Sequence, residues 1–333
     1  MNRAFTSRYN PLYHSGAIAI AMLLVLVATG IYLLIYYRLG APYDSVERIN
    51  GQVWTGRWLR GLHRFASDVA VVAALVHAFR MYAQRRTWGP RALAWVSGAV
   101  LLGVILVSGW TGYVLVWDAH AQLLAVEGAR LLDAVPIFSE PIGRSFTGEA
   151  PLPSAFFFVN LFAHIALPLS MGVLLWVHLA RVARPVLLPA GRVLWGTLGA
   201  LTAVAVVWPV EMAAPADLLR LPAEVPLDWF FGFWLPVTQR LPAGVVWGVG
   251  SALAAVAIAV PWLTRPAAAE LPGPAVVDER TCTGCEQCVE DCPYDAIEMV
   301  TRSREGGEDA KGTARGGGRS ALVARVKTEL CTR

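Results

Sequence analysis

The segment RGLHRFASDVAVVAALVHAFR, residues 60–80, carries two histidines, His63 and His77, spaced fourteen residues apart. In an α-helix, fourteen residues advance by about 21 Å and return to within about 40° of the starting face. A helix over 58–83 therefore presents both imidazoles on one face, at two depths. The same segment contains Arg64 and Asp68, and charges at membrane depth are tolerated when they face a bundle interior or a cofactor.

A second pair, His164 and His178, repeats this spacing in an uncharged stretch over 150–180. If the two helices run in the same direction, His63 meets His164 near the outer face and His77 meets His178 near the cytoplasmic face. Imidazole suits iron as an axial ligand, and histidine is rare in membrane spans without such a role. The alternative is a set of hydrogen-bonded interior histidines, but the equal spacing of both pairs favours two bis-histidine sites.

Glycines repeat the same interval, with Gly16 and Gly30 in one apolar run and Gly98 and Gly112 in another. Glycine has no Cβ, so a flat macrocycle could approach the backbone at these positions. Small residues also line ordinary helix contacts in membranes, so this pattern supports the histidine prediction without carrying it alone.

The composition indicates a membrane protein, because 56% of the 333 residues are hydrophobic and only 16% are charged. Uncharged runs long enough to span a bilayer lie at 9–37, 92–117, 150–180, 193–210 and 241–264. With the segment over 58–83, they predict an all-α membrane protein of six spans. The first run is too long for a cleavable signal peptide.

Charge indicates how these spans are oriented. With six spans both termini lie on one side, and that side receives a group of arginines with no acid among them: Arg3, Arg8, Arg80, Arg85, Arg86, Arg91, Arg181, Arg184, Arg192 and Arg265. Arginine-rich short loops face the cytoplasm, so we expect a multi-pass inner-membrane protein with cytoplasmic termini. The net charge of +4 then reports topology and not nucleic-acid binding.

All five cysteines lie at or after Cys282. The run CTGCEQCVEDCP, residues 282–293, has the C-x2-C-x2-C-x3-C-P spacing of bacterial ferredoxins, whereas zinc sites more usually have two separated pairs. It predicts a [4Fe–4S] cluster held by Cys282, Cys285, Cys288 and Cys292. Cys331 is either spare or the first ligand of a second cluster motif continuing beyond residue 333. The glycine-rich, charged stretch over 302–320 indicates a disordered insertion.

At this point the chain resembles the cytochrome b family of quinol-oxidising complexes. The matching motifs are Thr29-Gly30, the S-V-x-x-I stretch at 45–49, R-x-x-H at 60–63, H-x-x-R at 77–80, GYVLVW at 112–117 and HIALP at 164–168. The resemblance implies a four-helix bundle that holds two b haems, with Arg60 and Arg80 neutralising the haem propionates. It covers residues 8–264 and lacks the two terminal helices of the family.

The resemblance extends to a loop that contains the acidic quinol-site motif P-E-W-Y in the family and reads Leu227-Asp228-Trp229-Phe230 here. It implies that Asp228 accepts a quinol proton; the alternative is a solvated loop acid. The two remaining histidines, His14 and His120, are expected to be interfacial polar residues and not ligands.

These observations predict a cytochrome b-like di-haem bundle at 1–184, two further transmembrane helices at 185–265, a linker at 266–274 and an α+β ferredoxin-like domain at 275–333. The predicted function is that of an oxidoreductase subunit, which passes electrons between a quinone pool and a cytoplasmic redox protein within a larger membrane complex. The alternatives are a haem-containing anchor for a soluble dehydrogenase or hydrogenase-like partner, without its own quinone site, and a haem-free transporter whose histidines relay protons.

Overall fold

A computed structural model describes residues 10–136, 140–146, 152–180, 185–221, 225–267, 273–292, 295–302, 321–328 and 330–331. Nearly all of the predicted insertion over 302–320, and the middle of the predicted linker, lie outside these ranges.

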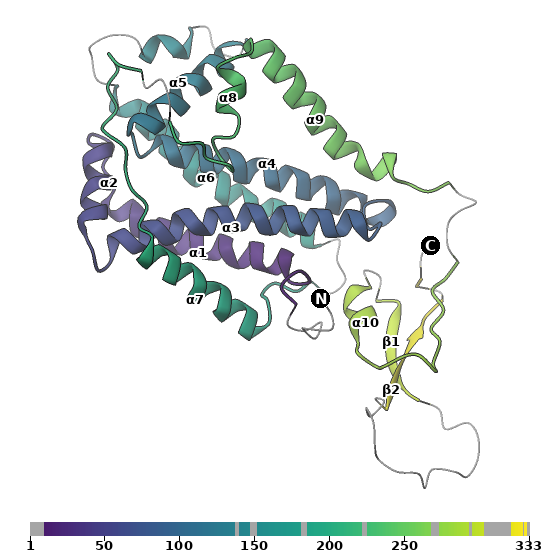
Figure 1. Ribbon diagram of the computed structural model, residues 1–333. Coiled ribbons are helices and arrows are strands. Elements are labelled where there is room, and N and C mark those ends of the chain that lie inside the picture. The colour runs from purple at the N-terminus through teal and green to yellow at the C-terminus, as the bar shows by residue number, and fades with distance from the viewer. Residues whose placement is uncertain are drawn as a thin grey trace, which may run out of the picture.

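The membrane part is all-α, as predicted (Figure 1). Within the described residues, five helices are long and apolar enough to cross a bilayer: α1 (Ser15–Tyr36), α3 (Gly56–Ala83), α4 (Ala92–Val114), α6 (Ser154–Leu179) and α9 (Ala243–Leu263). The segment with charges at membrane depth, α3, is therefore long and apolar enough to span a bilayer despite Arg64 and Asp68.

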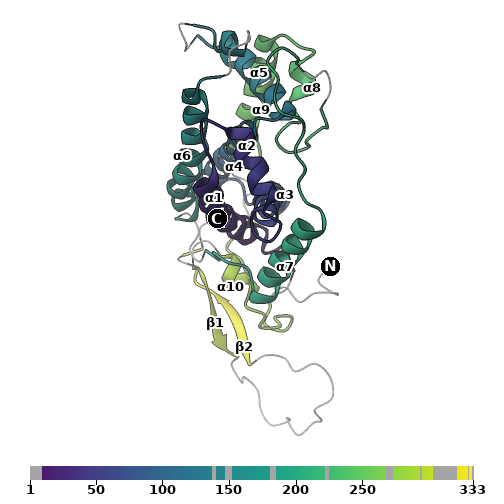
Figure 2. The same ribbon diagram turned by 90° about the vertical axis from the view of Figure 1, so that its left-hand side faces the viewer.

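The first four of these helices form a bundle made of two helix pairs (Figure 2). Helix α1 packs along α3, and α4 packs along α6, whereas the two pairs meet mainly through α3 and α4. Small residues such as Ala66 and Ala70 are fully buried in the α1–α3 contact, which lets the two backbones lie close together.

The helix α7 (Gly191–Val207) is shorter than the run predicted at 193–210. Its 17 residues span about 26 Å, near the lower limit for crossing the hydrocarbon core. It ends at Val207 because Pro209 disfavours the helical conformation of Trp208. Ala205 of α7 packs against Gly61 of α3, where an added Cβ would lie 3.3 Å from the Ala205 Cβ.

Short helices that the sequence did not predict lie in the connections from α1 to α3, from α4 to α6 and from α7 to α9: α2 (Pro42–Gly51), α5 (Ala119–Asp133), α8 (Leu235–Thr238) and the 3-10 turn η3 (Ile142–Phe146). A further 3-10 turn, η2 (Gly89–Arg91), precedes α4. Asp118 caps α5, because its Oδ1 accepts from the Ala121 amide at 2.9 Å. Its Oδ2 accepts from the Ala213 amide at 3.1 Å, which ties α5 to the segment after α7.

The C-terminal part forms a small α+β unit, as predicted (Figure 1). It contains α10 (Gln287–Asp291) and the antiparallel strands β1 (Ile297–Thr301) and β2 (Leu322–Val326), with Ile297 opposite Val326. Its core includes Val289, Ala296 and Val323.

Candidate redox sites

The four membrane histidines face one another as two pairs at two depths. The His63 and His164 ring centres are 6.2 Å apart, and the His77 and His178 ring centres are 6.3 Å apart. Imidazole nitrogens bind transition metals at about 2.0–2.1 Å. Because a ring centre lies roughly 1.1 Å behind its nitrogen, two imidazoles on opposite sides of one iron have centres about 6.3 Å apart. Both pairs therefore have the separation of axial ligands to one iron.

Each of the four glycines lies against the ring of one of the four histidines. A Cβ added at Gly112 would lie 2.8 Å from His164 Cε1, and one at Gly16 would lie 3.0 Å from His77 Cε1. The corresponding distances are 3.3 Å from Gly30 to His63 and 3.2 Å from Gly98 to His178. Each glycine thus leaves room for one imidazole, while the approach of a macrocycle at these positions stays a prediction.

A hydroxyl residue precedes each of these glycines in the sequence: Ser15, Thr29, Ser97 and Thr111. Three of these hydroxyls contact a histidine Nδ1, at 2.9 Å for Thr29 and His63, 3.1 Å for Ser97 and His178, and 3.3 Å for Thr111 and His164. Engaging Nδ1 orients the ring and leaves Nε2 as the nitrogen available to bind a metal.

His77 is the exception among the four. Its Nδ1 is buried without a hydrogen-bond partner among the described residues, and the Ser15 hydroxyl instead donates to the Leu12 carbonyl at 3.0 Å. The four imidazoles are therefore held unequally.

The two arginines expected near haem propionates both lie on α3, one turn from a histidine, and both donate to backbone carbonyls. Arg60 donates to Val210 at 2.7 Å, and Arg80 donates to Tyr13 at 2.6 Å. These bonds join α3 to the segments beyond α7 and before α1. The propionate role of both arginines stays a prediction.

The reading of Asp228 as a solvated loop acid is wrong, because its side chain is only 7% exposed. Its Oδ2 accepts from Arg64 and from the Tyr113 hydroxyl, while its Oδ1 accepts from the backbone amides of Phe230 at 2.9 Å and Phe231 at 2.6 Å. The Phe231 ring lies against Gly109 of α4, which seats this loop on the bundle.

These bonds set the charge of Asp228. Burial acts to raise the pKa of Asp228, but the Tyr113 hydrogen bond, the charge of Arg64 and the two amides outweigh it and hold the pKa below its usual value. Arg64 also forms an ion pair with Asp68 one turn along α3. We refer to Arg64, Asp68, Tyr113 and Asp228 as the charged cluster.

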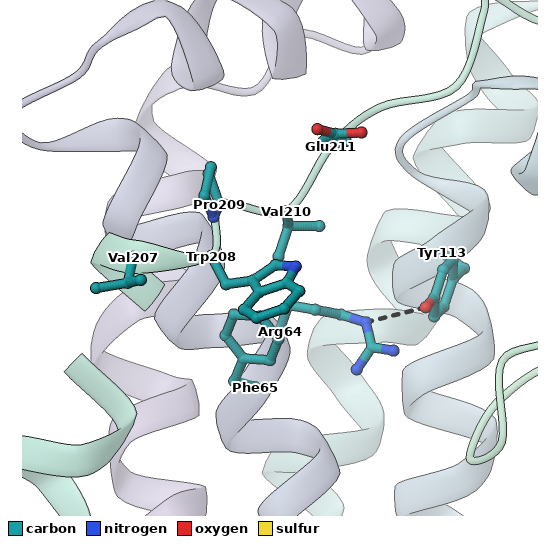
Figure 3. Close-up of a pocket in the computed structure, with 8 residues that line it drawn as sticks. All are labelled: Arg64, Phe65, Tyr113, Val207, Trp208, Pro209, Val210 and Glu211. Atoms are coloured by element: carbon teal, nitrogen blue, oxygen red, sulfur yellow. Dashed lines mark hydrogen bonds between the residues drawn. The ribbon is translucent and has the colours of Figure 1, made fainter. Parts of the chain in front are cut away.

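A cavity of about 730 Å³ lies beside the charged cluster (Figure 3). It is lined by Arg64 and Phe65 of α3, Tyr113 of α4, the last residue of α7 and the segment 208–211 that follows. Figure 3 shows the Arg64 guanidinium pointing to the Tyr113 hydroxyl, to which its Nε donates at 2.9 Å. The sequence marked Arg64 only as a charge at membrane depth and did not single out Tyr113 or Trp208 as lining a site.

The cysteine run begins in the loop before α10, continues through that helix, which contains Cys288, and reaches Cys292 directly after it. In the loop, Gly284 turns the chain with a φ of 69° that favours glycine. The Ala324 and Gly284 amides lower the pKa of the Cys282 thiol, which favours the thiolate that iron binds. Arg302 donates to the Cys282 carbonyl at 3.0 Å and holds the loop against β1.

Cys331 follows β2, and its backbone amide donates to the Lys327 carbonyl at 3.0 Å. Within the described ranges, no three histidine, cysteine or acidic side chains converge closely enough to hold a metal ion as they stand.

Comparison with known proteins decides the family. The family model for cytochrome b/b6/petB matches residues 2–185. The chain belongs to the cytochrome b family. A second model, the 4Fe-4S binding domain, matches residues 275–298. Both parts of the resemblance seen in the motifs are confirmed.

Individual relatives agree with this assignment. Cytochrome b6 of Porphyra purpurea is 33% identical over 183 residues, which cover 53% of this chain and 83% of that protein. A solved structure described as "Hyperthermophilic respiratory Complex III" matches with a TM-score of 0.59 at 18% identity, covering 76% of this chain and 75% of its own, and shows the common fold. The chain is therefore an integral membrane electron-transfer subunit of the cytochrome b type, with b-type haem and iron–sulfur cofactors.

Proposed function

We propose that this cytochrome b family member passes electrons between a quinone pool in the membrane and a cytoplasmic redox protein, through two b haems and a [4Fe–4S] cluster. The observation that carries the quinone link is the cavity beside the charged cluster. Two of its lining residues are Arg64, which directly follows His63 of the outer histidine pair, and Tyr113, which directly follows Gly112, the glycine that lies against the His164 ring. A ligand in this cavity would therefore lie next to that pair.

The haem assignment has its support in the ring separations and in the glycine contacts. We propose that His63 and His164 hold the outer haem, and that His77 and His178 hold the cytoplasmic-side haem. When bound, haem iron accepts and releases single electrons. The chain positions the imidazoles, and Gly16, Gly30, Gly98 and Gly112 leave room for them.

The quinone assignment is supported by the mixed lining of the cavity. Phe65, Val207 and Trp208 offer an apolar wall for a ring, while Arg64 and Tyr113 offer N–H and O–H donors for a quinone oxygen. The four hydrogen bonds that Asp228 accepts favour a positioning role for it, in which the carboxylate holds Arg64 and Tyr113 in place.

For the C-terminal part, we propose that Cys282, Cys285, Cys288 and Cys292 hold the cluster on the cytoplasmic side, where a soluble redox protein exchanges electrons with it. The lowered pKa of Cys282 and the ferredoxin spacing support this role.

The test uses the purified full-length chain in detergent or proteoliposomes. We expect two b haems per chain, about six irons in total, and haem reduction by duroquinol as well as by dithionite. Reduction by dithionite alone would favour the anchor function without a quinone site. The lack of any b-type absorbance band would contradict both haem functions and leave the transporter.

A further inference from the structure

Arg302, the residue directly after β1, lies against the start of the cysteine run. One end nitrogen of its guanidinium donates to the Glu279 carbonyl, and the other donates to the Cys282 carbonyl at 3.0 Å. Both carbonyls belong to the turn over 278–282, which the Cys282 amide closes by donating to the Asp278 carbonyl at 3.0 Å. A single side chain therefore holds the turn that presents the first cysteine.

The two strands fix both Arg302 and Cys282. The Arg302 amide donates to the Ala321 carbonyl at 2.9 Å, directly beyond the last paired residues of β1 and β2. On the other strand, the Ala324 amide bonds to the Cys282 thiol. The same small sheet thus holds Cys282 through the backbone of β2 and through the side chain that follows β1.

Arg302 also brings a positive charge to this turn. Its two acceptors are uncharged backbone carbonyls, so these bonds do not cancel the charge of the guanidinium, which is always protonated. The Ala324 and Gly284 amides lower the pKa of the Cys282 thiol most, and the charge of Arg302 acts in the same direction and outweighs the opposing Glu279 carboxylate. The guanidinium is therefore close enough to influence the first cysteine.

Such a charge matters for a redox centre. One-electron reduction adds a negative charge to an iron–sulfur cluster, so a fixed positive charge favours the reduced form. Net charge, hydrogen bonding and solvent exposure around the sulfurs set the potential of such clusters.

We propose that Arg302 is a positioning residue for the iron–sulfur centre, which holds the turn that presents Cys282 and raises the reduction potential of the cluster by its charge. This inference rests on the proposed binding of the cluster by Cys282, Cys285, Cys288 and Cys292. It makes the cluster easier to reduce by a soluble one-electron donor.

The variants Arg302→Gln and Arg302→Lys test this role in the purified full-length chain. Glutamine removes the charge, whereas lysine keeps the charge without the planar fork. The potential of the cluster is measured by redox titration followed by low-temperature electron paramagnetic resonance. We expect Arg302→Gln to weaken the reduction equilibrium about tenfold, which lowers the potential by about 59 mV. Arg302→Lys should show less than half of this shift.

Arg325→Gln provides the matched control, because it removes one positive charge from the same unit at an exposed position on β2. Solvent screens an exposed charge, so we expect less than a third of the Arg302→Gln shift. The haem potentials should stay as in the wild type in all three variants.

The outcomes separate the role of Arg302 from the binding of the cluster. An unchanged potential in Arg302→Gln, or an equal shift in Arg325→Gln, overturns the role of Arg302. If Arg302→Gln loses the signal, Arg302→Lys decides: a signal at nearly the wild-type potential supports the role, and a lost signal or a tenfold shift overturns it. A wild type that has haem iron but no cluster signal after reduction overturns the proposed cluster binding itself.

Discussion

Replacing Gly112 by alanine should remove the outer haem and leave the other one in place. In the structure, the added Cβ would lie 2.8 Å from His164 Cε1 and 3.2 Å from His164 Nδ1. Carbon atoms pack at about 3.5–4.0 Å, so the ring must move by roughly 0.7 Å. Forcing extra atoms into a packed site costs about 1–3 kcal/mol, and the displaced imidazole would also lose its alignment with His63.

Gly103 provides the matched control, because it lies on the same helix, α4, with nothing within 4 Å of an added Cβ. Alanine there relieves the helix penalty of glycine, so Gly103→Ala should be neutral or stabilising by up to about 1 kcal/mol. The haem content of both variants is measured from dithionite-reduced minus oxidised spectra, normalised to protein.

We expect Gly112→Ala to lose about half of the b-type absorbance, since only one histidine pair is disturbed. The residual haem should keep the midpoint potential of the cytoplasmic-side site. Full haem content in Gly112→Ala, with both potentials unchanged, would refute the argument that this glycine makes room for the His164 ring.

Three further changes address other contacts. Thr29→Val removes the hydroxyl from His63 Nδ1, and we expect the loss, about 1 kcal/mol, to appear as a shifted midpoint potential of the outer haem alone in a redox titration. Asp228→Asn leaves the guanidinium of Arg64 without one of its carboxylate partners, so duroquinol-dependent haem reduction should slow at least tenfold while reduction by dithionite persists; an unaltered duroquinol rate would count against the positioning role. Cys282→Ser should abolish the iron–sulfur signal in electron paramagnetic resonance and leave the b-type haem absorbance intact, and a retained signal would contradict its assignment as a ligand.

The periodic features of the membrane part could be predicted from the sequence, because helix geometry alone places residues fourteen apart on one face. The pairing of His63 with His164 follows from that periodicity and from the direction of the two helices. The matching rows of glycines follow in the same way, although their contact with the rings required side-chain positions.

The charged cluster could not be predicted, because its members come from distant parts of the chain. Arg64 and Asp228 are 164 residues apart, and no local pattern indicates that they meet. His120, just after a span, was expected at the interface, and that stays a prediction; its ring packs against the Tyr113 ring, a contact that no local pattern indicates. The end of α7 at Val207, by contrast, was predictable from Pro209.

The division of the bundle into two helix pairs has a consequence for how the protein is assembled. Each proposed iron site takes one imidazole from the α1–α3 pair and one from the α4–α6 pair, while the pairs otherwise meet mainly through α3 and α4. Iron bound by both imidazoles of a pair would therefore cross-link the two helix pairs. Cofactor supply would then influence the stability of the bundle, because a chain without haem would lack this cross-link.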